Sequence, residues 1–216
     1  MTLMSMGNKH ISDELLAAFM EGNVNADEMA QVLQAAKDDA GLRETLDIAL
    51  QIDDDALPMM QMAAEGGRNL CDVQCEAYVL QHLGVDTSME ELFEVAKDNR
   101  WIRRAGTPLY CIGNLLEYMG LEVSRKYDAT IEDIQVALDK GYGIIAAVDC
   151  DKLYPERPDE EDATNHAIVP TAIDVAAGKI TVYDPENTVE TDIKLPLFMA
   201  AWKESRCYLV CARKKK

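Results

Sequence analysis

The sequence predicts an α+β fold in which helices come first and strands follow. Up to residue 140 the apolar residues recur at helical spacing behind recognisable N-capping residues, whereas beyond it they gather in short runs typical of strands. Helices and strands that occupy separate stretches of one chain favour the α+β class over an alternating α/β arrangement. With 216 residues, the chain is long enough to bury a substantial core without disulfide bonds.

Composition excludes several classes of function. The chain has 21 basic and 39 acidic residues, a net charge of −18, which is unsuited to binding the phosphate backbone of nucleic acid. No uninterrupted apolar run approaches the roughly 20 residues that cross a bilayer. The start of the chain has no apolar stretch typical of a secretory signal. We therefore expect a cytoplasmic protein with no nucleic-acid or membrane partner.

Residues 1–56 are more acidic than the rest of the chain and are expected to form a separate acidic helical module. Ser12 precedes an apolar pattern as an N-cap, and Asn25 with Glu28 forms a capping-box pattern. A third helical pattern follows over residues 42–50. These signals predict three short helices, joined by turns at Gly22 and Gly41.

Residues 57–68, which include a proline and a Gly-Gly pair, are interpreted as a linker, and residues 69–216 as the second domain. Four helices are predicted there: residues 69–84, a helix capped by Ser88, residues 108–119 with Thr107 as N-cap, and residues 130–140. Strands are predicted at residues 144–149, 167–174, 180–184 and 207–212. A long acidic loop, residues 151–165, separates the first two strands.

Cys71 carries the strongest chemical signal in the second domain. It lies near the start of the predicted helix 69–84, where unpaired backbone N–H groups and the helix dipole stabilise a thiolate. Cys75 lies one turn later, on the same stripe as Val79, and is predicted to be a packed core thiol. Burial as a small apolar residue is also the alternative for Cys71 itself.

Elimination among the three histidines identifies a base for such a thiolate. His10 lies near the start of the chain, which is expected to fray. His82 is on the same helix as Cys71, and at 1.5 Å per residue it is about 16 Å away along the axis. His166 remains, at the edge of a predicted strand and directly after the acidic loop. A structural histidine is the alternative.

Asp184 is the candidate partner of His166. It ends the next predicted strand, and a hairpin turn at residues 175–178 would bring the two strand ends together. A carboxylate there could accept a hydrogen bond from the imidazole and fix its tautomer. The alternative is an ordinary strand-ending Asp-Pro turn.

The segments around these three residues resemble a known family. The stretch from Cys71 to Gly84, CDVQCEAYVLQHLG, has the pattern of a nucleophile helix, and His166-Ala-Ile-Val followed by Asp184-Pro185 has the pattern of its two partner motifs. The family is the papain-like cysteine peptidases, specifically the bacteriocin-leader (double-glycine) peptidase branch, and the resemblance covers roughly residues 65–212. It implies a papain-like α+β fold, with a helical half followed by an antiparallel β half.

The resemblance also implies a reaction. Cys71 would attack a peptide carbonyl, His166 would move the proton and Asp184 would orient the imidazole, with no cofactor and no metal. A peptide or protein is the expected substrate. A transglutaminase-like use of the same triad is a further option, because the pocket selects the acyl acceptor.

Two positions depart from the family pattern. Asp72 stands where the family usually has a glycine, and it puts a negative charge beside the proposed thiolate. The position of the family's oxyanion-hole glutamine is occupied by Glu65, with Gln61 the nearest glutamine upstream. An ionised glutamate cannot donate a hydrogen bond, so Gln61, a protonated Glu65 or backbone amides would have to serve. The alternative is a catalytically degenerate module that binds a protein partner.

Three other features have weaker interpretations. A zinc site at the pairs Cys71/Cys75 and Cys207/Cys211 is disfavoured, because strand positions four apart stand about 13 Å from each other. The N-terminal helices weakly resemble those of anti-sigma-type proteins, without the zinc ligands, which implies a docking surface for a protein partner; packing against the main domain is the alternative. The acidic loop 151–165 would favour cationic peptides or gate the site, unless it is simply solvated.

Overall fold

The computed structural model describes residues 11–20, 26–51, 70–102, 106–155, 166–187 and 189–215. The chain divides into two compact units, residues 1–55 and residues 56–216. Within the described ranges, no helix is long and apolar enough to span a bilayer.

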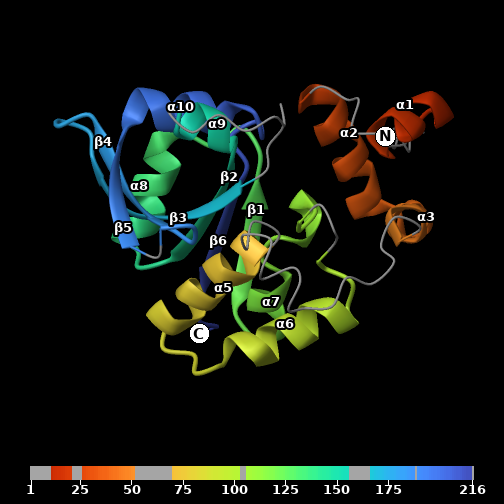
Figure 1. The fold of residues 1–216 in the computed structure, drawn as a ribbon, viewed down its shortest axis with the longest axis horizontal. Coiled ribbons are helices and arrows are strands. Elements are labelled where there is room, and N and C mark those ends of the chain that lie inside the picture. The colour runs from red at the N-terminus through yellow and green to blue at the C-terminus, as the bar shows by residue number, and fades with distance from the viewer. Residues whose placement is uncertain are drawn as a thin grey trace, which may run out of the picture. The chain divides into compact units, whose positions relative to one another are not determined.

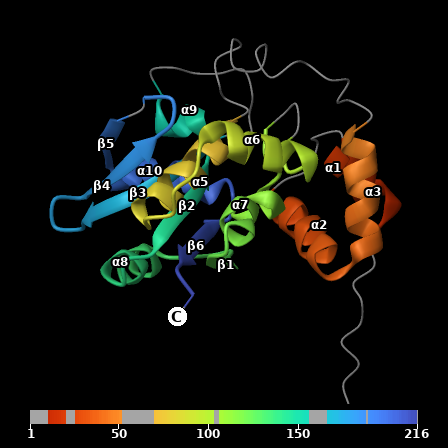
Figure 2. The ribbon, with the colours of Figure 1, turned by 90° about the horizontal axis from the view of Figure 1, so that it is seen from below.

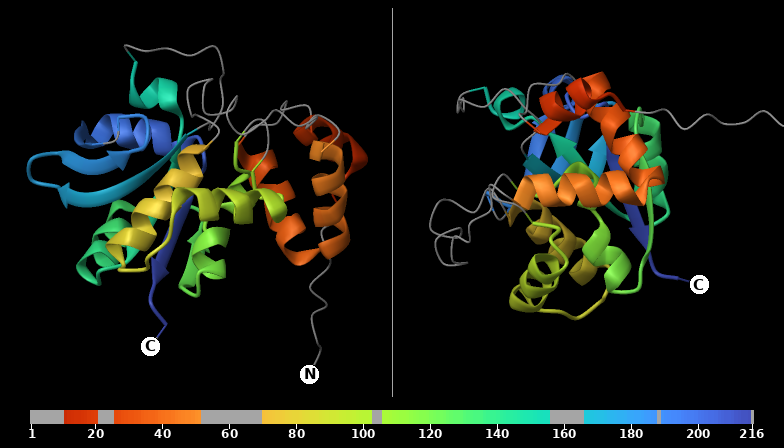
Figure 3. Two further views of the ribbon diagram at one scale, coloured as in Figure 1. Left: turned by 60° about the horizontal axis from the view of Figure 1, so that its bottom comes forward. Right: turned by 90° about the vertical axis from the view of Figure 1, so that its right-hand side faces the viewer.

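The described part of the first unit consists of α1 (Asp13–Met20), α2 (Ala26–Asp38) and α3 (Ala40–Gln51), drawn in red and orange in Figure 3. The Ser12 hydroxyl accepts a hydrogen bond from the Leu15 N–H at 3.2 Å, as expected for an N-cap. Val32, Ala36 and Leu46 are buried and form the centre of a small core.

The turn predicted at Gly41 is wrong. Gly41 lies inside α3, and the break between α2 and α3 falls at Asp39. The Asp39 carboxylate accepts hydrogen bonds from the N–H groups of Gly41 and Leu42, at 2.9 and 3.0 Å, and so caps α3. The predicted turn at Gly22 and the capping residue Asn25 lie outside the described residues.

The described part of the second unit is built around a six-stranded sheet with the order β1-β6-β2-β3-β4-β5 (Figure 1, Figure 2). The strands are β1 (Glu122–Lys126), β2 (Gly143–Val148), β3 (His166–Asp174), β4 (Lys179–Asp184), β5 (Val189–Lys194) and β6 (Leu209–Arg213). Every neighbouring pair is antiparallel. This sheet is the antiparallel half expected from the sequence.

Helices cover both faces of the sheet. One core contains residues of α5 (Cys71–His82), α6 (Met89–Asp98) and α7 (Asn114–Tyr118), and the other contains residues of α8 (Ile131–Asp139), α9 (Cys150–Leu153) and α10 (Leu195–Lys203). Strand β2 faces both, because Ile145 and Ala147 lie in the first core while Ile144 and Ala146 lie in the second. All residues of β2 are therefore buried.

The helices α6 and α8, each directly preceded by its capping residue, begin where the sequence predicts. The Ser88 hydroxyl accepts a hydrogen bond from the Glu91 N–H at the start of α6. Thr130 and Asp133 form a reciprocal capping box at the start of α8. The turn between β3 and β4 also lies at the predicted residues 175–178.

The prediction of one helix over residues 108–119 is wrong. A 3₁₀ turn, Leu109–Cys111, comes first, and α7 begins only after Gly113, whose φ of 88° is left-handed. A residue in this conformation interrupts a right-handed helix. Thr107 caps neither segment: among the described residues its hydroxyl has no hydrogen-bond partner.

Several elements carry little local signal and were not predicted. β1 and β5 are the edge strands of the sheet and are largely polar and exposed, so they lack an apolar run. The helices α9 and α10 were also missed. α9 occupies the start of the predicted loop 151–165, and residues 156–165 of that loop lie outside the described residues.

Gly143, the first residue of β2, lies where α5 packs closely on the sheet. A Cβ atom added there would lie 2.3 Å from Cγ1 of Val79, closer than carbon atoms approach one another. Gly143 therefore allows the helix that begins with Cys71 to pack directly on the strand.

Gly143→Ala should destabilise the second unit by about 1–3 kcal/mol, because the added methyl group overlaps Val79 and the helix must move. Urea unfolding measures this cost. In a Val79→Ala background the same substitution should cost much less, since the overlapping methyl group is absent. Equal costs in the two backgrounds would contradict the close approach.

Candidate active site

Cys71 is the first residue of α5, and its side chain is buried. Leu70 precedes it as the N-cap and gives the helix no side-chain hydrogen bond. The first backbone N–H groups of α5 therefore have no cap from this residue, and together with the helix dipole they favour an anion. The position is suited to a thiolate.

Three contacts fix α5 on the sheet. The Cys75 thiol donates a hydrogen bond to the carbonyl oxygen of Ala167, the second residue of β3, at 3.2 Å. Tyr78 stacks on Tyr183 of β4 with ring centroids 4.1 Å apart, and its hydroxyl donates to Glu190 of β5 at 2.7 Å. Burial raises the pKa of Cys75, so it stays a neutral core thiol, as predicted.

His166 and Asp184 lie at the same end of a hairpin. His166 is the first residue of β3 and Asp184 the last of β4, opposite the end where the turn at residues 175–178 joins the strands. The imidazole Nε2 lies 2.8 Å from Oδ1 of Asp184, and both side chains are buried. The structure thus brings these two sequence-predicted residues into direct contact.

The surroundings of His166 favour its charged form. Burial disfavours the imidazolium, yet hydrogen bonds to Asp184 and to Cys71 raise the pKa of His166 to about 10. Burial likewise opposes ionisation of Asp184, but the hydrogen bond from His166 holds the pKa of that carboxyl below its ordinary value. Because Nε2 faces Asp184, Nδ1 is the ring atom available to Cys71. The three side chains form one connected chain.

Asp184 has three further hydrogen-bond donors. The Tyr154 hydroxyl donates to Oδ2, the Asn187 amide donates to Oδ2 at 3.2 Å, and the Glu186 N–H donates to Oδ1 at 3.0 Å. Burial and the hydrogen bond to Asp184 raise the pKa of Tyr154, so the hydroxyl keeps its proton. Together these groups hold the carboxylate that faces His166.

Sequence analysis missed Tyr154 and Asn187. Asn187 lies three residues after Asp184 in the turn that follows β4, and an amide at that spacing is a local signal that could have identified it. Tyr154 is 30 residues away from Asp184 in the sequence and directly follows α9, so no pattern relates the two.

Of the remaining candidates from the sequence, only His82 lies in the described part of the chain, and it is at the far end of α5 from Cys71. His82 is the last residue of α5, and its ring lies beside that of Tyr78, with centroids 6.5 Å apart. Gln61, Glu65 and His10 lie outside the described residues. In the described part of the chain, no group of three or more His, Cys, Asp or Glu side chains is placed to hold a metal ion.

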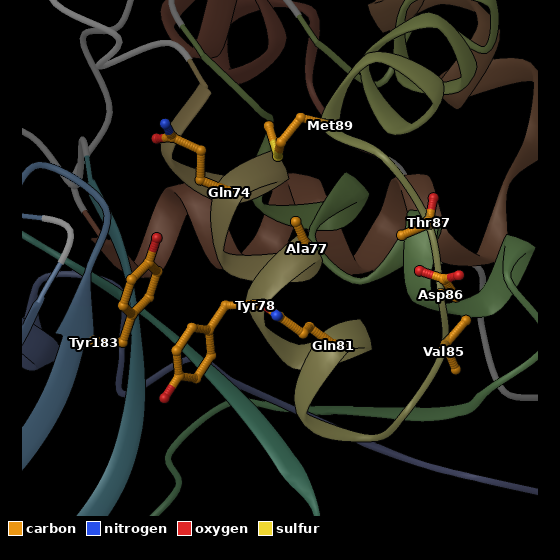
Figure 4. A pocket seen from close by; sticks show the side chains of 9 residues that line it. All are labelled: Gln74, Ala77, Tyr78, Gln81, Val85, Asp86, Thr87, Met89 and Tyr183. Carbon is orange, nitrogen blue, oxygen red and sulfur yellow. The ribbon is translucent and has the colours of Figure 1, made fainter.

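A pocket of about 420 Å³ lies along the outer face of α5 (Figure 4). Its lining comes from α5, the segment before α6, the first residue of α6, and β4: Gln74, Ala77, Tyr78, Gln81, Val85, Asp86, Thr87, Met89 and Tyr183. The side chains of Gln74 and Tyr183 lie at the same end of the pocket (Figure 4). Gln74 is three residues after Cys71 and Tyr183 directly precedes Asp184, so α5 and β4 carry both the pocket and candidate catalytic residues.

Comparison with one solved structure supports the fold, and a second solved structure also matches the chain. A putative C39-like peptidase from Bacillus anthracis is 13% identical, with a TM-score of 0.53, over 68% of this chain and 90% of its own. The peptidase domain of Streptococcus ComA, a bifunctional ABC transporter involved in quorum sensing, is 18% identical, with a TM-score of 0.49, over 68% of this chain and 93% of its own. No curated protein matches the sequence.

A family model matches residues 53–210, which is more than half of the chain and includes Cys71, His166 and Asp184. The family is described as the Peptidase_C39 like family. The match agrees with the papain-like arrangement of a helical half and an antiparallel sheet described above. The chain therefore belongs to the Peptidase_C39 like family of cysteine peptidases.

Proposed function

We propose that the second unit hydrolyses peptide bonds through a covalent thioester, with Cys71 as nucleophile, His166 as acid and base, and Asp184 as the residue that orients the imidazole. The observation that carries this proposal is the 2.8 Å contact between Nε2 of His166 and Asp184, on a ring that also hydrogen-bonds to Cys71. Membership of a cysteine-peptidase family supports the reaction class.

The reaction begins with Cys71 as thiolate and His166 as imidazolium. The sulfur attacks the scissile carbonyl carbon and forms a C–S bond, and His166 gives its proton to the amine nitrogen as the C–N bond breaks. The neutral imidazole then takes a proton from water, whose oxygen attacks the thioester carbon. As the acid product leaves, the C–S bond breaks and the thiolate and imidazolium are restored.

The tetrahedral intermediate needs hydrogen-bond donors for its oxyanion. In this proposal the backbone N–H groups at the start of α5 provide them, because Leu70 does not cap the helix with a side chain. Gln61 and Glu65, from the segment before α5, are the further candidates. A neutral side chain at Glu65 would be required for donation, since a carboxylate only accepts hydrogen bonds.

The substrate in this proposal is a peptide that passes the start of α5 and places one side chain in the pocket beside Gln74. The aromatic rings of Tyr78 and Tyr183 and the side chain of Met89 give the pocket apolar walls. A cavity of about 420 Å³ accommodates a large apolar or aromatic side chain.

Iodoacetamide should alkylate Cys71 faster than the other cysteines below pH 7, because a thiolate reacts and a thiol does not. His166→Ala should slow alkylation of Cys71 at pH 6 by about tenfold or more. Mass mapping of modified peptides measures each site, and the half-buried Cys207 serves as the control that His166→Ala leaves unchanged. If Cys71 reacts no faster than Cys207, the unit is a degenerate binding module and no hydrolase.

Asp184→Asn should lower kcat on a cleaved library peptide by about 10²- to 10⁴-fold, because an amide neither stabilises the imidazolium nor fixes its tautomer. Tyr154→Phe should lower kcat by only about tenfold, since the carboxylate keeps its other donors. Tyr118→Phe, at a position 60% exposed, is the control and should change nothing. Full activity in Asp184→Asn would contradict the assigned role.

Ala77→Trp should raise KM by about tenfold or more and leave kcat within about twofold, because the indole fills the pocket without touching the reacting groups. Steady-state kinetics with peptides that differ in one apolar side chain would measure the change. Lys97→Trp, on the exposed surface of α6, controls for the added aromatic ring. An unchanged KM in Ala77→Trp would exclude this pocket from substrate binding.

A further inference from the structure

The carboxyl groups of Asp72 and Glu76 are buried together in the first two turns of α5, directly after Cys71. Asp72 is 3% exposed and Glu76 is 1% exposed, and their spacing of four residues places them on one side of the helix. Neither group has a role in the proposed reaction. Two ionised carboxylates buried side by side repel each other and lack solvation, which makes full ionisation of both unfavourable.

Glu76 links the nucleophile helix to the next helical segment. Its Oε1 accepts a hydrogen bond from the Gly113 N–H at 3.0 Å, and its Oε2 accepts one from the Leu116 N–H at 2.8 Å. Glu76 therefore caps the start of α7, the function that the sequence pattern assigned to Thr107. Each oxygen has a second lone pair, so a protonated Glu76 could keep both bonds and donate its O–H to Asp72.

The Asp72 carboxyl lacks a hydrogen-bond donor at one of its oxygens in the described part of the chain. Its Oδ1 is buried and accepts no hydrogen bond from any described residue, and the same is true of the nearby Thr107 hydroxyl. Glu76 and Thr107 are the neighbouring polar groups that act on the pKa of the Asp72 carboxyl. A proton carried by the Glu76 carboxyl, together with the rotatable Thr107 hydroxyl, would provide the donors that Asp72 lacks.

The other charged and titratable groups near the pair do not replace this proton. Arg125 of β1 acts on Asp72 over a distance, but its guanidinium is hydrogen-bonded to Glu117 at 3.0 Å. Tyr208, which directly precedes β6, and Cys75 of α5 also interact electrostatically with Asp72, and burial raises the pKa of both, so they are neutral. Among the described residues, no cationic side chain hydrogen-bonds to either carboxyl.

The same surroundings shift both carboxyls toward their protonated forms. Burial raises the pKa of Asp72 to about 6. Burial, and then the charge of Asp72, raise the pKa of Glu76 well above its ordinary range. One of the two protons is therefore expected to leave near pH 6, while the other stays on the pair.

We propose that Asp72 and Glu76 regulate Cys71 through the loss of one of their two protons. With both carboxyls protonated, the pair is neutral. When one proton is lost to water, the two carboxyls share the proton that remains, and the single buried negative charge beside the nucleophile lowers the reactivity of Cys71. This inference rests on the proposed role of Cys71 as the nucleophile. The expected consequence is that the ratio of peptidase activity below pH 6 to activity above pH 6 is higher than the Cys71–His166 pair alone would give.

The shared proton is tested by unfolding the full chain in urea between pH 5 and 7.5. Groups whose folded-state pKa is raised contribute stability that is complete below the ordinary value and is lost as pH rises through the folded value. The wild-type midpoint should therefore fall over this range, and that of Asp72→Asn should fall less. Glu76→Gln gives a second test if Asp72→Asn does not fold, and Glu90→Gln, exposed in the first turn of α6, is the control. Parallel profiles for wild type, Asp72→Asn and Glu76→Gln would overturn the shared proton.

Regulation of Cys71 is tested by its alkylation rate over the same pH range. The ratio of the rate in Asp72→Asn to that in wild type should rise about three- to tenfold from pH 5 to 7.5, because only the wild type acquires the opposing charge. A constant ratio, with Cys71 still reactive, would overturn the regulation. If Cys71 is unreactive in wild type at every pH, the proposed peptidase function fails and its regulation with it, while the urea profiles still decide whether the pair shares a proton.

Discussion

The packing of α5 on the sheet is the constraint on which the rest of the candidate site depends. Gly143 allows the close approach, and the hydrogen bond from Cys75 to the Ala167 carbonyl fixes the helix along β3. Because Cys71 is one turn before Cys75 and His166 is one residue before Ala167, this contact also brings the sulfur and the imidazole together. A glycine and a core thiol, neither of which reacts, therefore determine the geometry of the residues that would react.

Buried carboxyl groups near this contact differ in charge because they differ in hydrogen-bond donors. Asp184 is fully buried, yet His166 and three further donors hold its pKa below the ordinary value, so it stays ionised. Glu76 receives only two backbone N–H groups and lies beside Asp72, and burial raises its pKa. At similar burial, the number of donors and the sign of the neighbouring charge decide which carboxyl is ionised.

The sequence predicts those features that depend on neighbouring residues. Ser88 caps the helix that starts at the next residue, and the turn at residues 175–178 places Asp184 beside His166. Features that depend on distant residues were not predictable. The start of α7 is capped by Glu76, 37 residues before Gly113 in the sequence. The local pattern at residues 108–119 therefore predicted the wrong start for this helix. The edge strands β1 and β5 are polar, and Tyr154 meets its partner only in the fold.

The surroundings of Asp72 likewise depend on distant residues and could not be predicted from its neighbours in the sequence. In the sequence its charge stands next to Cys71 and counts against a thiolate there. Successive helical residues point about 100° apart, however, and the Asp72 carboxyl has Glu76 and Thr107 as its polar neighbours, whereas Cys71 hydrogen-bonds to His166. Because the carboxyl is buried without a cation, its charge depends on pH. A residue whose charge counts against activity in the sequence is therefore, in our proposal, the residue that makes this activity depend on pH.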